Sequence, residues 1–212
     1  SLKYKKSKSN VFSRINLEIN KGEVIGIKGQ TGSGKSSFLN VLMGLIKPSF
    51  GKIEIDGLNI YENNYPFNLF KWRKTIAHVP QNIFLMNSSI AENIAFELTK
   101  EELNMSKVVK AAEEANLDSF IKNLPEGFDT LVGENGVKLS GGQKQRIGIA
   151  RALYKEASVL VFDEATSSLD TFTESKILKT IYSLRGDKTI FIISHRLETL
   201  EKCDQLIEFP IK

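Results

Sequence analysis

Short apolar stretches alternate with longer amphipathic stretches along most of the chain. Apolar runs rich in β-branched residues predict buried strands at 23–28, 75–79, 158–162, 189–193 and 205–209. Apolar residues at helical spacing predict helices at 36–46, 88–96, 100–117 and 171–184. Strands that alternate with helices in this way are typical of an α/β fold with a mainly parallel sheet.

Two further stretches, 11–20 and 52–56, alternate apolar and polar residues, so each is expected to form a half-exposed strand. The first part of the chain should therefore be rich in β-structure. No strand signal is present in residues 82–157. We expect this middle stretch to form a helical subdomain inserted into the α/β domain, with Thr99 capping the helix that begins at Lys100.

The composition adds few constraints to this pattern. With 41% hydrophobic and 25% charged residues in a chain of 212, it is that of an ordinary globular protein. No apolar run approaches the roughly 18 residues of a membrane span, and the first ten residues lack the apolar segment of a signal peptide. Cys203 is the only cysteine, which excludes an intrachain disulfide and suits a reducing compartment.

The net charge of +4 would allow nucleic acid or an anionic membrane surface as a partner. The basic residues are not interleaved with aromatic ones, as they are in proteins that bind single-stranded nucleic acid. We therefore interpret them as a solvated surface.

The Gly-rich stretch GQTGSGKS carries the clearest chemistry, because it fits the pattern G-x-x-x-x-G-K-[ST] between a predicted strand and a predicted helix. Its glycines let the backbone pass close to a phosphate, whose charge the loop amides and the helix N-terminus can bind. Lys35 would reach the β- and γ-phosphates, and the Ser36 hydroxyl suits Mg²⁺. A turn that only joins a strand to a helix needs neither residue. The expected nucleotide contacts are Gly29, Gln30, Thr31, Gly32, Ser33, Gly34, Lys35, Ser36 and Ser37.

Two acidic residues, Asp163 and Glu164, directly follow the predicted strand 158–162. In a parallel sheet, ligand groups gather at the carboxyl ends of strands, so both should lie beside the Gly-rich loop. Asp163 would orient the Mg²⁺ shell, and Glu164 would accept a proton from the attacking water. The alternative is a strand that simply ends in surface acids.

A second Gly-rich stretch, LSGGQ, begins at Leu139 and precedes the helical sequence KQRIGIARAL. Ser140 can cap that helix, and with the amides of Gly141 and Gly142 it would form a second anion site. By this pentapeptide, and by its position between the first Gly-rich loop and Asp163, the chain resembles the ATP-binding cassette (ABC) family. The resemblance covers nearly the whole chain. Ser37 is a departure, since Thr is usual there.

The resemblance implies roles for several other residues. Tyr4 lies where the family stacks an aromatic ring on adenine, and Gln81 matches a glutamine that approaches Mg²⁺ and the attacking water. Asp170 belongs to the family's D-loop, and His195 matches a histidine that contacts the γ-phosphate. The implied catalytic residues are Glu164, His195 and Gln81; the metal ligands are Ser36, Gln81 and Asp163; the remaining ATP contacts are Tyr4, Ser140, Gly141, Gly142, Gln143 and Asp170.

Two stretches, Ser89–Ile94 and Thr130–Gly136, resemble segments that face the membrane domain in the exporter branch, with Glu134 as the acid of the second. The resemblance therefore implies an ATP-hydrolysing nucleotide-binding domain at the cytoplasmic face of a cell membrane. Its partners would be a transmembrane domain and a second nucleotide-binding domain, identical or different, paired head to tail around ATP. ADP would be the product, and nucleic acid would not be a partner.

The implied fold is a P-loop NTPase core with a mainly parallel sheet, an antiparallel β subdomain and an inserted helical subdomain. Residues 1–81 and 146–212 would form the RecA-like core with its β subdomain, and 82–145 the helical subdomain, within one domain, 1–212. Two other functions stay open: a soluble cassette ATPase acting on nucleic acid or the ribosome, and a nucleotide sensor that does not hydrolyse ATP. Lys35, Glu164 and His195 argue against the sensor.

Overall fold

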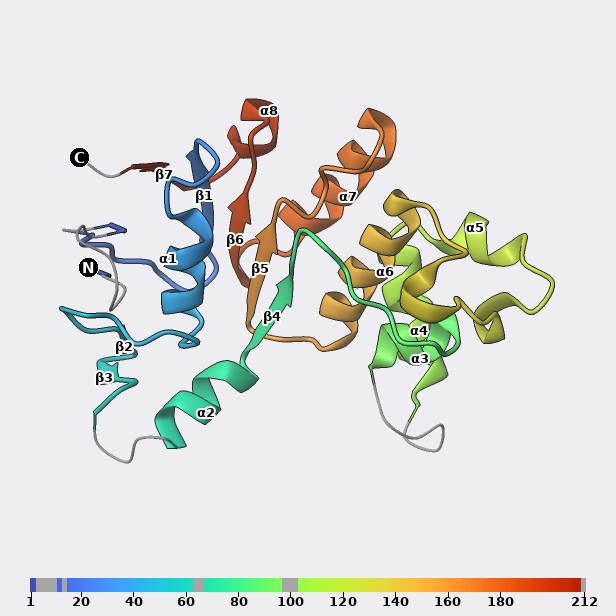
Figure 1. The fold of residues 1–212 in the computed structure, drawn as a ribbon, viewed down its shortest axis with the longest axis horizontal. Helices are drawn as coiled ribbons and strands as arrows, with labels where there is room; N and C mark the ends of the chain where they lie inside the picture. Colours follow the sequence, from blue (N-terminus) through green and yellow to red (C-terminus); the bar gives the residue numbers. More distant parts are fainter. Residues whose placement is uncertain (3–10, 13–14, 63–66, 97–102, 211–212) are drawn as a thin grey trace.

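A five-stranded sheet forms the centre of the computed structural model, which describes residues 1–2, 11–12, 15–62, 67–96 and 103–210 (Figure 1). In spatial order its strands are β4 (Ile76–Val79), β5 (Val159–Asp163), β6 (Thr189–Ile193), β1 (Val24–Gly29) and β7 (Gln205–Phe209). All four pairings between them are parallel. The predicted parallel sheet is therefore confirmed, with each strand within one residue of its expected bounds.

Both faces of the sheet are covered, which explains why its three central strands, β5, β6 and β1, are mostly apolar, whereas the outer strands β4 and β7 also contain exposed polar residues, His78 and Glu208. Successive residues of β5 alternate between two hydrophobic clusters, with Leu160 and Phe162 in one and Val159 and Val161 in the other. Helix α1 (Lys35–Leu42) contributes to the second cluster, whereas α6 (Gly141–Tyr154) and α7 (Thr171–Ser183) contribute to the first. In Figure 1 the sheet accordingly lies between α1 and the α6–α7 pair.

Helix α2 (Phe67–Lys74) was not expected from the sequence. Two of its side chains bind the end of α1 and the residues just after it, since Trp72 Nε1 donates to Leu42 O at 2.8 Å and Arg73 donates to Gly44 O. Helix α1 itself ends at Leu42, four residues before the predicted end at 46.

The predicted β subdomain is present but smaller than its sequence pattern indicates. Strands β2 (Glu54–Ile55) and β3 (Leu58–Asn59) form an antiparallel pair of two residues each. The predicted strand 11–20 is wrong in the described part of that range, which contains only an isolated bridge from Phe12 to Leu2. Burial nevertheless alternates along 15–20 as the pattern indicated, so the side chains pack as expected without a hydrogen-bonded ladder.

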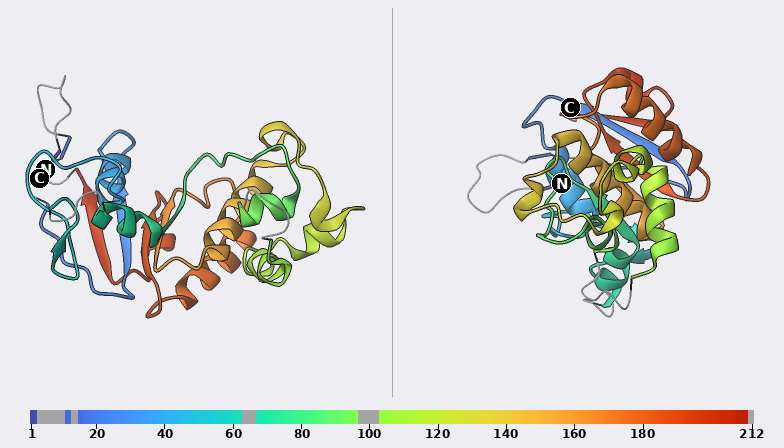
Figure 2. Two further views of the ribbon diagram at one scale, coloured as in Figure 1. Left: turned by 90° about the horizontal axis from the view of Figure 1, so that it is seen from below. Right: turned by 90° about the vertical axis from the view of Figure 1, so that its right-hand side faces the viewer.

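Several helices gather at the end of the molecule away from β2 and β3 (Figures 1 and 2). They are α3 (Ile90–Ala95), α4 (Met105–Glu114), α5 (Asp118–Lys122) and two 3₁₀ turns, η2 (Gly127–Asp129) and η3 (Glu134–Gly136). Both α3 and α4 pack against α6. Of the described residues in 82–157, none belongs to a strand, and a single isolated bridge joins Ser89 to Leu131.

The start of α4 differs from the prediction. Asn104 caps this helix by accepting a hydrogen bond from the Lys107 amide at 3.1 Å. The expected cap, Thr99, lies outside the described residues. The proposed boundary between residues 145 and 146 falls inside α6, so the two expected subdomains would share that helix. Within the described ranges, none of the helices has the length and apolarity that crossing a bilayer requires.

Candidate active site

The first Gly-rich loop joins β1 to α1, and its backbone geometry requires glycine. Gly29 and Gly34 have φ angles of 151° and 103°, a region that side chains disfavour. A Cβ atom at Gly29 would also lie 2.4 Å from the carbonyl oxygen of Phe209. At Gly32 an added Cβ would have no atom within 4 Å, counting only the described residues, so the loop is open on that side.

Two polar groups of this loop are buried in a way that suits a bound phosphate. The Lys35 side chain belongs to a residue only 6% exposed, and its Nζ donates to the carbonyl oxygens of Gly29 at 2.7 Å and Gln30 at 2.8 Å. Ser33 Oγ is buried and, in the described part of the chain, has no hydrogen-bond partner. A buried hydroxyl without a partner is costly, and an anion in the loop would satisfy it. The loop therefore fits a nucleotide phosphate.

Asp163, the last residue of β5, lies beside this loop. Burial and the neighbouring Glu164 carboxylate raise the pKa of Asp163, whereas a hydrogen bond from the Ser36 hydroxyl and the charge of Lys35 lower it. Hydroxyl and carboxylate oxygens are ligands that Mg²⁺ accepts, usually together with water and substrate phosphates. Among the described residues there is no group of three or more His, Cys, Asp or Glu side chains that could hold a metal ion.

Glu164 receives one partner from each neighbouring strand of the sheet. Gln81 follows β4, Glu164 follows β5 and His195 follows β6, so all three lie at the carboxyl ends of adjacent strands. Gln81 Nε2 donates to Glu164 Oε2 at 2.9 Å, and His195 Nε2 lies 2.7 Å from Glu164 Oε1. The structure thus brings together the three residues expected to be catalytic.

The backbone of Glu164 is strained, because its φ of 52° places a non-glycine residue in the left-handed region. Its amide donates to the carbonyl oxygen of Ile193 at 3.1 Å, and its own carbonyl accepts from Ser167. Such strain persists where the surroundings fix it, and it is frequent at functional sites.

The second Gly-rich stretch begins α6, and Ser140 caps this helix as predicted. Ser140 Oγ accepts from the Gln143 amide at 3.3 Å, and Gln143 Oε1 accepts from the Ser140 amide at 2.8 Å, which completes a capping box. A Cβ at Gly142 would lie 3.3 Å from the carbonyl oxygen of Ser168. The sheet separates this helix from α1 in Figures 1 and 2. Within one chain, the two Gly-rich stretches therefore do not form a common site.

The remaining predicted contacts have these positions. Asp170 caps α7 by accepting from the Thr173 amide at 2.9 Å, and this hydrogen bond lowers the pKa of Asp170. Gln30 and Thr31 are exposed on the loop. Tyr4 lies outside the described residues, so its adenine contact stays a prediction.

Sequence reasoning missed Gln145, a buried residue of α6 that is 3% exposed. Its side chain donates to Ser167 Oγ at 3.3 Å and accepts from the Ser168 amide at 2.9 Å. These bonds connect the second Gly-rich helix to the loop that follows Glu164. The available signal was a polar residue on a helix face that is otherwise formed by Gly148, Ile149 and Ala152.

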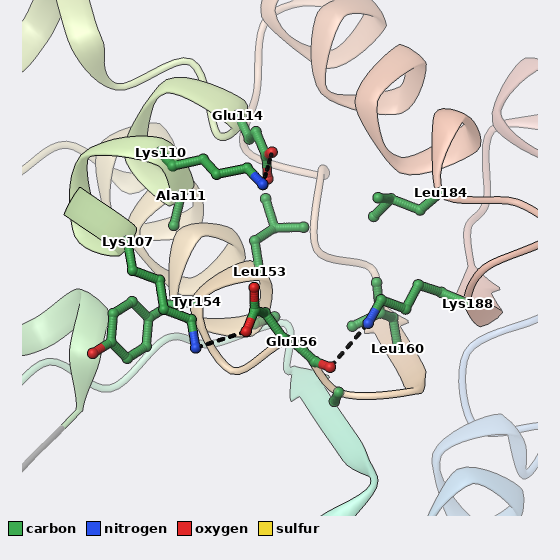
Figure 3. Close-up of a pocket in the computed structure, with 12 residues that line it drawn as sticks. Lys107, Lys110, Ala111, Glu114, Leu153, Tyr154, Glu156, Leu160, Leu184 and Lys188 are labelled. Carbon is green, nitrogen blue, oxygen red and sulfur yellow. Dashed lines mark hydrogen bonds and ion pairs between the residues drawn. The ribbon is translucent and has the colours of Figure 1, made fainter. Parts of the chain in front are cut away.

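A groove of about 220 Å³ lies elsewhere, between α4, the end of α6 and the start of β5 (Figure 3). Its lysines already have partners in the chain. Lys107 pairs with Glu156 at 2.9 Å, Lys110 with Glu114 at 3.9 Å, and Lys188 donates to the Glu156 carbonyl at 2.9 Å. The three lysines and two glutamates that line the groove leave it with a net charge of +1, and it is separate from the candidate site.

The chain is similar to a known protein family, to several curated proteins and to a solved structure. A family model described as "ABC transporter" matches residues 12–167. The "ATP-dependent lipid A-core flippase" of Idiomarina loihiensis is 41% identical over 204 residues, which cover 96% of this chain and 34% of that protein. The protein of the same name from Coxiella burnetii is 42% identical over 207 residues, 98% of this chain and 34% of its own.

A plant relative, "ABC transporter B family member 29, chloroplastic" of Arabidopsis thaliana, is 41% identical over 94% of this chain and 31% of its own length. A solved structure titled "Structure of a bacterial Atm1-family ABC exporter with ATP bound" has a TM-score of 0.89 and 36% identity. That match covers 98% of this chain and 35% of the exporter chain. The chain thus spans about a third of the length of the relatives it matches.

Proposed function

The chain belongs to the ABC transporter family, and we propose that it binds and hydrolyses ATP to power export or flipping by a transporter. The observation that carries this proposal is the convergence of Gln81 and His195 on Glu164, at the carboxyl ends of the strands, where the first Gly-rich loop follows β1. The relatives are named as lipid A-core flippases and as an ABC transporter, so a soluble ATPase acting on nucleic acid or the ribosome is not favoured.

The first Gly-rich loop would bind the ATP phosphates. Lys35 Nζ donates two of its three N–H groups to loop carbonyls, so the third, together with one of these two after a rotation, would donate to the β- and γ-phosphates. Ser33 Oγ, which has no hydrogen-bond partner among the described residues, would gain one, and the N-terminus of α1 would add its positive end. Tyr4 would stack on the adenine.

The carboxylate of Glu164 would act as the general base. Each of its oxygens has a second lone pair in addition to the one used by Gln81 or His195, so a water can still bind. That water would lose a proton to Glu164 while its oxygen forms a bond to the γ-phosphorus. The bond from that phosphorus to the leaving ADP oxygen would break, giving ADP and inorganic phosphate.

The two side chains on Glu164 would orient this step. Gln81 would hold the carboxylate and the water, and His195 would contact the γ-phosphate. Ser36, Asp163 and Gln81 would hold Mg²⁺, which when bound neutralises charge on the phosphates.

Assembly is part of the proposal. Two nucleotide-binding domains would pair head to tail, so that Ser140, Gly141 and Gly142 of one reach the ATP held by the other. The separation of α1 from α6 within one chain supports this arrangement, because it leaves the second Gly-rich stretch without a phosphate of its own. A transmembrane domain would complete the transporter and place this domain at the cytoplasmic face of a membrane.

Release of phosphate from ATP tests the proposal. Glu164→Gln keeps the size and hydrogen bonding of the side chain but cannot accept the proton, so the rate should fall by about 10²–10⁴-fold while ATP still binds. Glu156→Gln is a matched control, because Glu156 has nearly the same backbone, with φ of 53° against 52°, and lies in the separate groove. Unchanged hydrolysis by Glu164→Gln, or no hydrolysis by a wild-type chain that binds ATP, would contradict the proposal.

A further inference from the structure

Glu174, on the buried side of α7, has no role in the chemistry described so far. The residue is 5% exposed, and among the described Asp and Glu residues it is the only one in the buried class. Burying a carboxylate is costly unless the charge is paired and hydrogen-bonded. The partners of Glu174 should therefore explain why its carboxylate is buried.

The partners of Glu174 come from the two loops that carry the candidate catalytic groups. Its Oε1 accepts from Thr166 Oγ1 at 2.8 Å and from Thr199 Oγ1 at 3.4 Å. Its Oε2 forms an ion pair with Arg196. Thr166 lies two residues after Glu164, Arg196 directly follows His195, and Thr199 belongs to α8 (Leu197–Leu200).

We propose that Glu174 is a positioning residue, which holds the Glu164 loop and the His195 loop in a fixed relation through Thr166 and Arg196. This inference rests on the proposed ATP hydrolysis. The side chain of His195 is 46% exposed, so its position depends on the backbone of its own loop as well as on the contact with Glu164. The ion pair with Arg196 links the buried carboxylate of Glu174 to the backbone of the His195 loop.

The charge is the part of Glu174 that this role requires. Glu174→Gln keeps the volume of the side chain and can still hydrogen-bond both threonines, but it removes the ion pair. Arg196, whose side chain is 45% exposed, would then be free to turn into solvent, and the His195 loop would lose its link to α7. Misplacement of a catalytic group by about 1 Å can cost about 10²-fold in rate.

The test compares turnover with nucleotide affinity. We expect Glu174→Gln to lower kcat by about 10- to 100-fold and to leave the dissociation constant of ATP within about twofold. Affinity should persist because Lys35 and its loop do not contact Glu174. Arg196→Gln changes a half-exposed residue, so it serves if the buried variant does not fold, and it should lower kcat to a similar extent. The double variant should be no slower than the slower single variant, since both changes remove one contact.

Asp204→Asn provides the matched control. Asp204 also pairs with an arginine, Arg185, and it accepts from the Val24 amide at 2.8 Å. Asp204 lies at the amino ends of β1 and β7, whereas Glu164 lies at the carboxyl end of β5, on the opposite side of the sheet. Its substitution should lower the melting temperature but leave kcat within about twofold, because it touches neither loop.

The outcomes separate this inference from the function on which it rests. If Glu174→Gln and Arg196→Gln lower the melting temperature as the control does and leave kcat unchanged, the network is only structural and the inference is wrong. If both variants lower kcat and weaken ATP binding together, the effect is general and again contradicts a positioning role. If Glu164→Gln hydrolyses ATP at the wild-type rate, the proposed function itself fails.

Discussion

The chain contains two Gly-rich helix starts, and they differ in how the helix N-terminus is satisfied. At α1 the N-cap is Gly34, in the left-handed region, and no side chain in the described part of the chain caps the helix. At α6 the N-cap is Ser140, in an extended conformation, and a complete capping box with Gln143 satisfies it. A glycine-rich sequence before a helix therefore does not by itself define one kind of site.

The difference extends to charge. The first start holds the buried ammonium of Lys35 and the hydroxyl of Ser33, which has no hydrogen-bond partner among the described residues; an anion would satisfy both. Residues 140–143 carry no charge, and the side chains of Ser140 and Gln143 each accept a hydrogen bond from the other residue's backbone amide. The first start is thus suited to bind a phosphate alone, whereas the second is suited to contact one that is already bound. The predictions below test this contrast, from the largest expected effect to the smallest.

The largest effect should come from Lys35→Ala. Two charge-assisted hydrogen bonds to phosphate, at about 1.5–3 kcal/mol each, would be lost, so ATP affinity should fall by about 100-fold or more. Calorimetric titration with ATP measures this. Lys28→Ala is the control, because Lys28 belongs to the same strand–loop segment but pairs with Glu208 at 3.1 Å. Equal affinity in Lys35→Ala and wild type would show that the ammonium is not at the phosphates.

A smaller effect, confined to assembly, is expected from Ser140→Arg. In the Glu164→Gln background ATP should persist and hold two copies together, which a sizing column detects. A bulky side chain in the facing phosphate site typically costs about 1–3 kcal/mol, so the ATP-dependent dimer should weaken by about tenfold or more. ATP binding to the monomer should stay within about twofold.

Two results of that experiment would contradict the proposed difference between the two Gly-rich helix starts. An undiminished dimer would show that the second Gly-rich start does not act across the interface. A loss of ATP binding by the monomer would show that both starts meet in one chain, contrary to the separation of α1 and α6.

The sequence predicted some elements of the fold better than others, and the differences have physical causes. The five strands of the sheet were predicted within one residue, because strands such as β5 and β6 are buried on both faces and are continuously apolar. The alternation of 15–20 gave the correct burial but the wrong backbone, since side-chain pattern does not specify the hydrogen-bonded partner. Helix α2 was missed because its exposed and buried apolar residues, such as Phe70 and Leu69, show no single apolar face.

In the candidate site, motif spacing predicted which residues gather but not how they are held. Gln81, Glu164 and His195 each follow a strand, and the strand order places them together. Gln145 and Glu174 were not predicted, because a single polar residue in an amphipathic helix is usually a surface residue. Only the packing of α6 and α7 shows that their side chains are buried against the loops at 165–170 and 194–199.

The smallest expected effects concern the two serines, which should respond in opposite ways. Ser140→Ala removes a helix cap, so the free energy of unfolding should fall by about 1 kcal/mol, while the monomer's affinity for ATP is unchanged. Ser33→Ala removes a buried hydroxyl that has no partner among the described residues, so stability should be unchanged or slightly higher. Its ATP affinity should nevertheless fall by about fivefold, the effect of one lost hydrogen bond.

Denaturant unfolding without nucleotide and ATP titration measure these four quantities on the same two variants. A serine that caps a helix stabilises the folded chain whether or not ATP is present. A serine whose hydroxyl binds only the phosphate adds to stability only when ATP is bound. If Ser33→Ala is destabilised as much as Ser140→Ala and binds ATP normally, Ser33 belongs to the fold and not to the phosphate site. If Ser140→Ala weakens ATP binding by the monomer, the second Gly-rich start contacts nucleotide within its own chain, and the two regions are less different than their capping indicates.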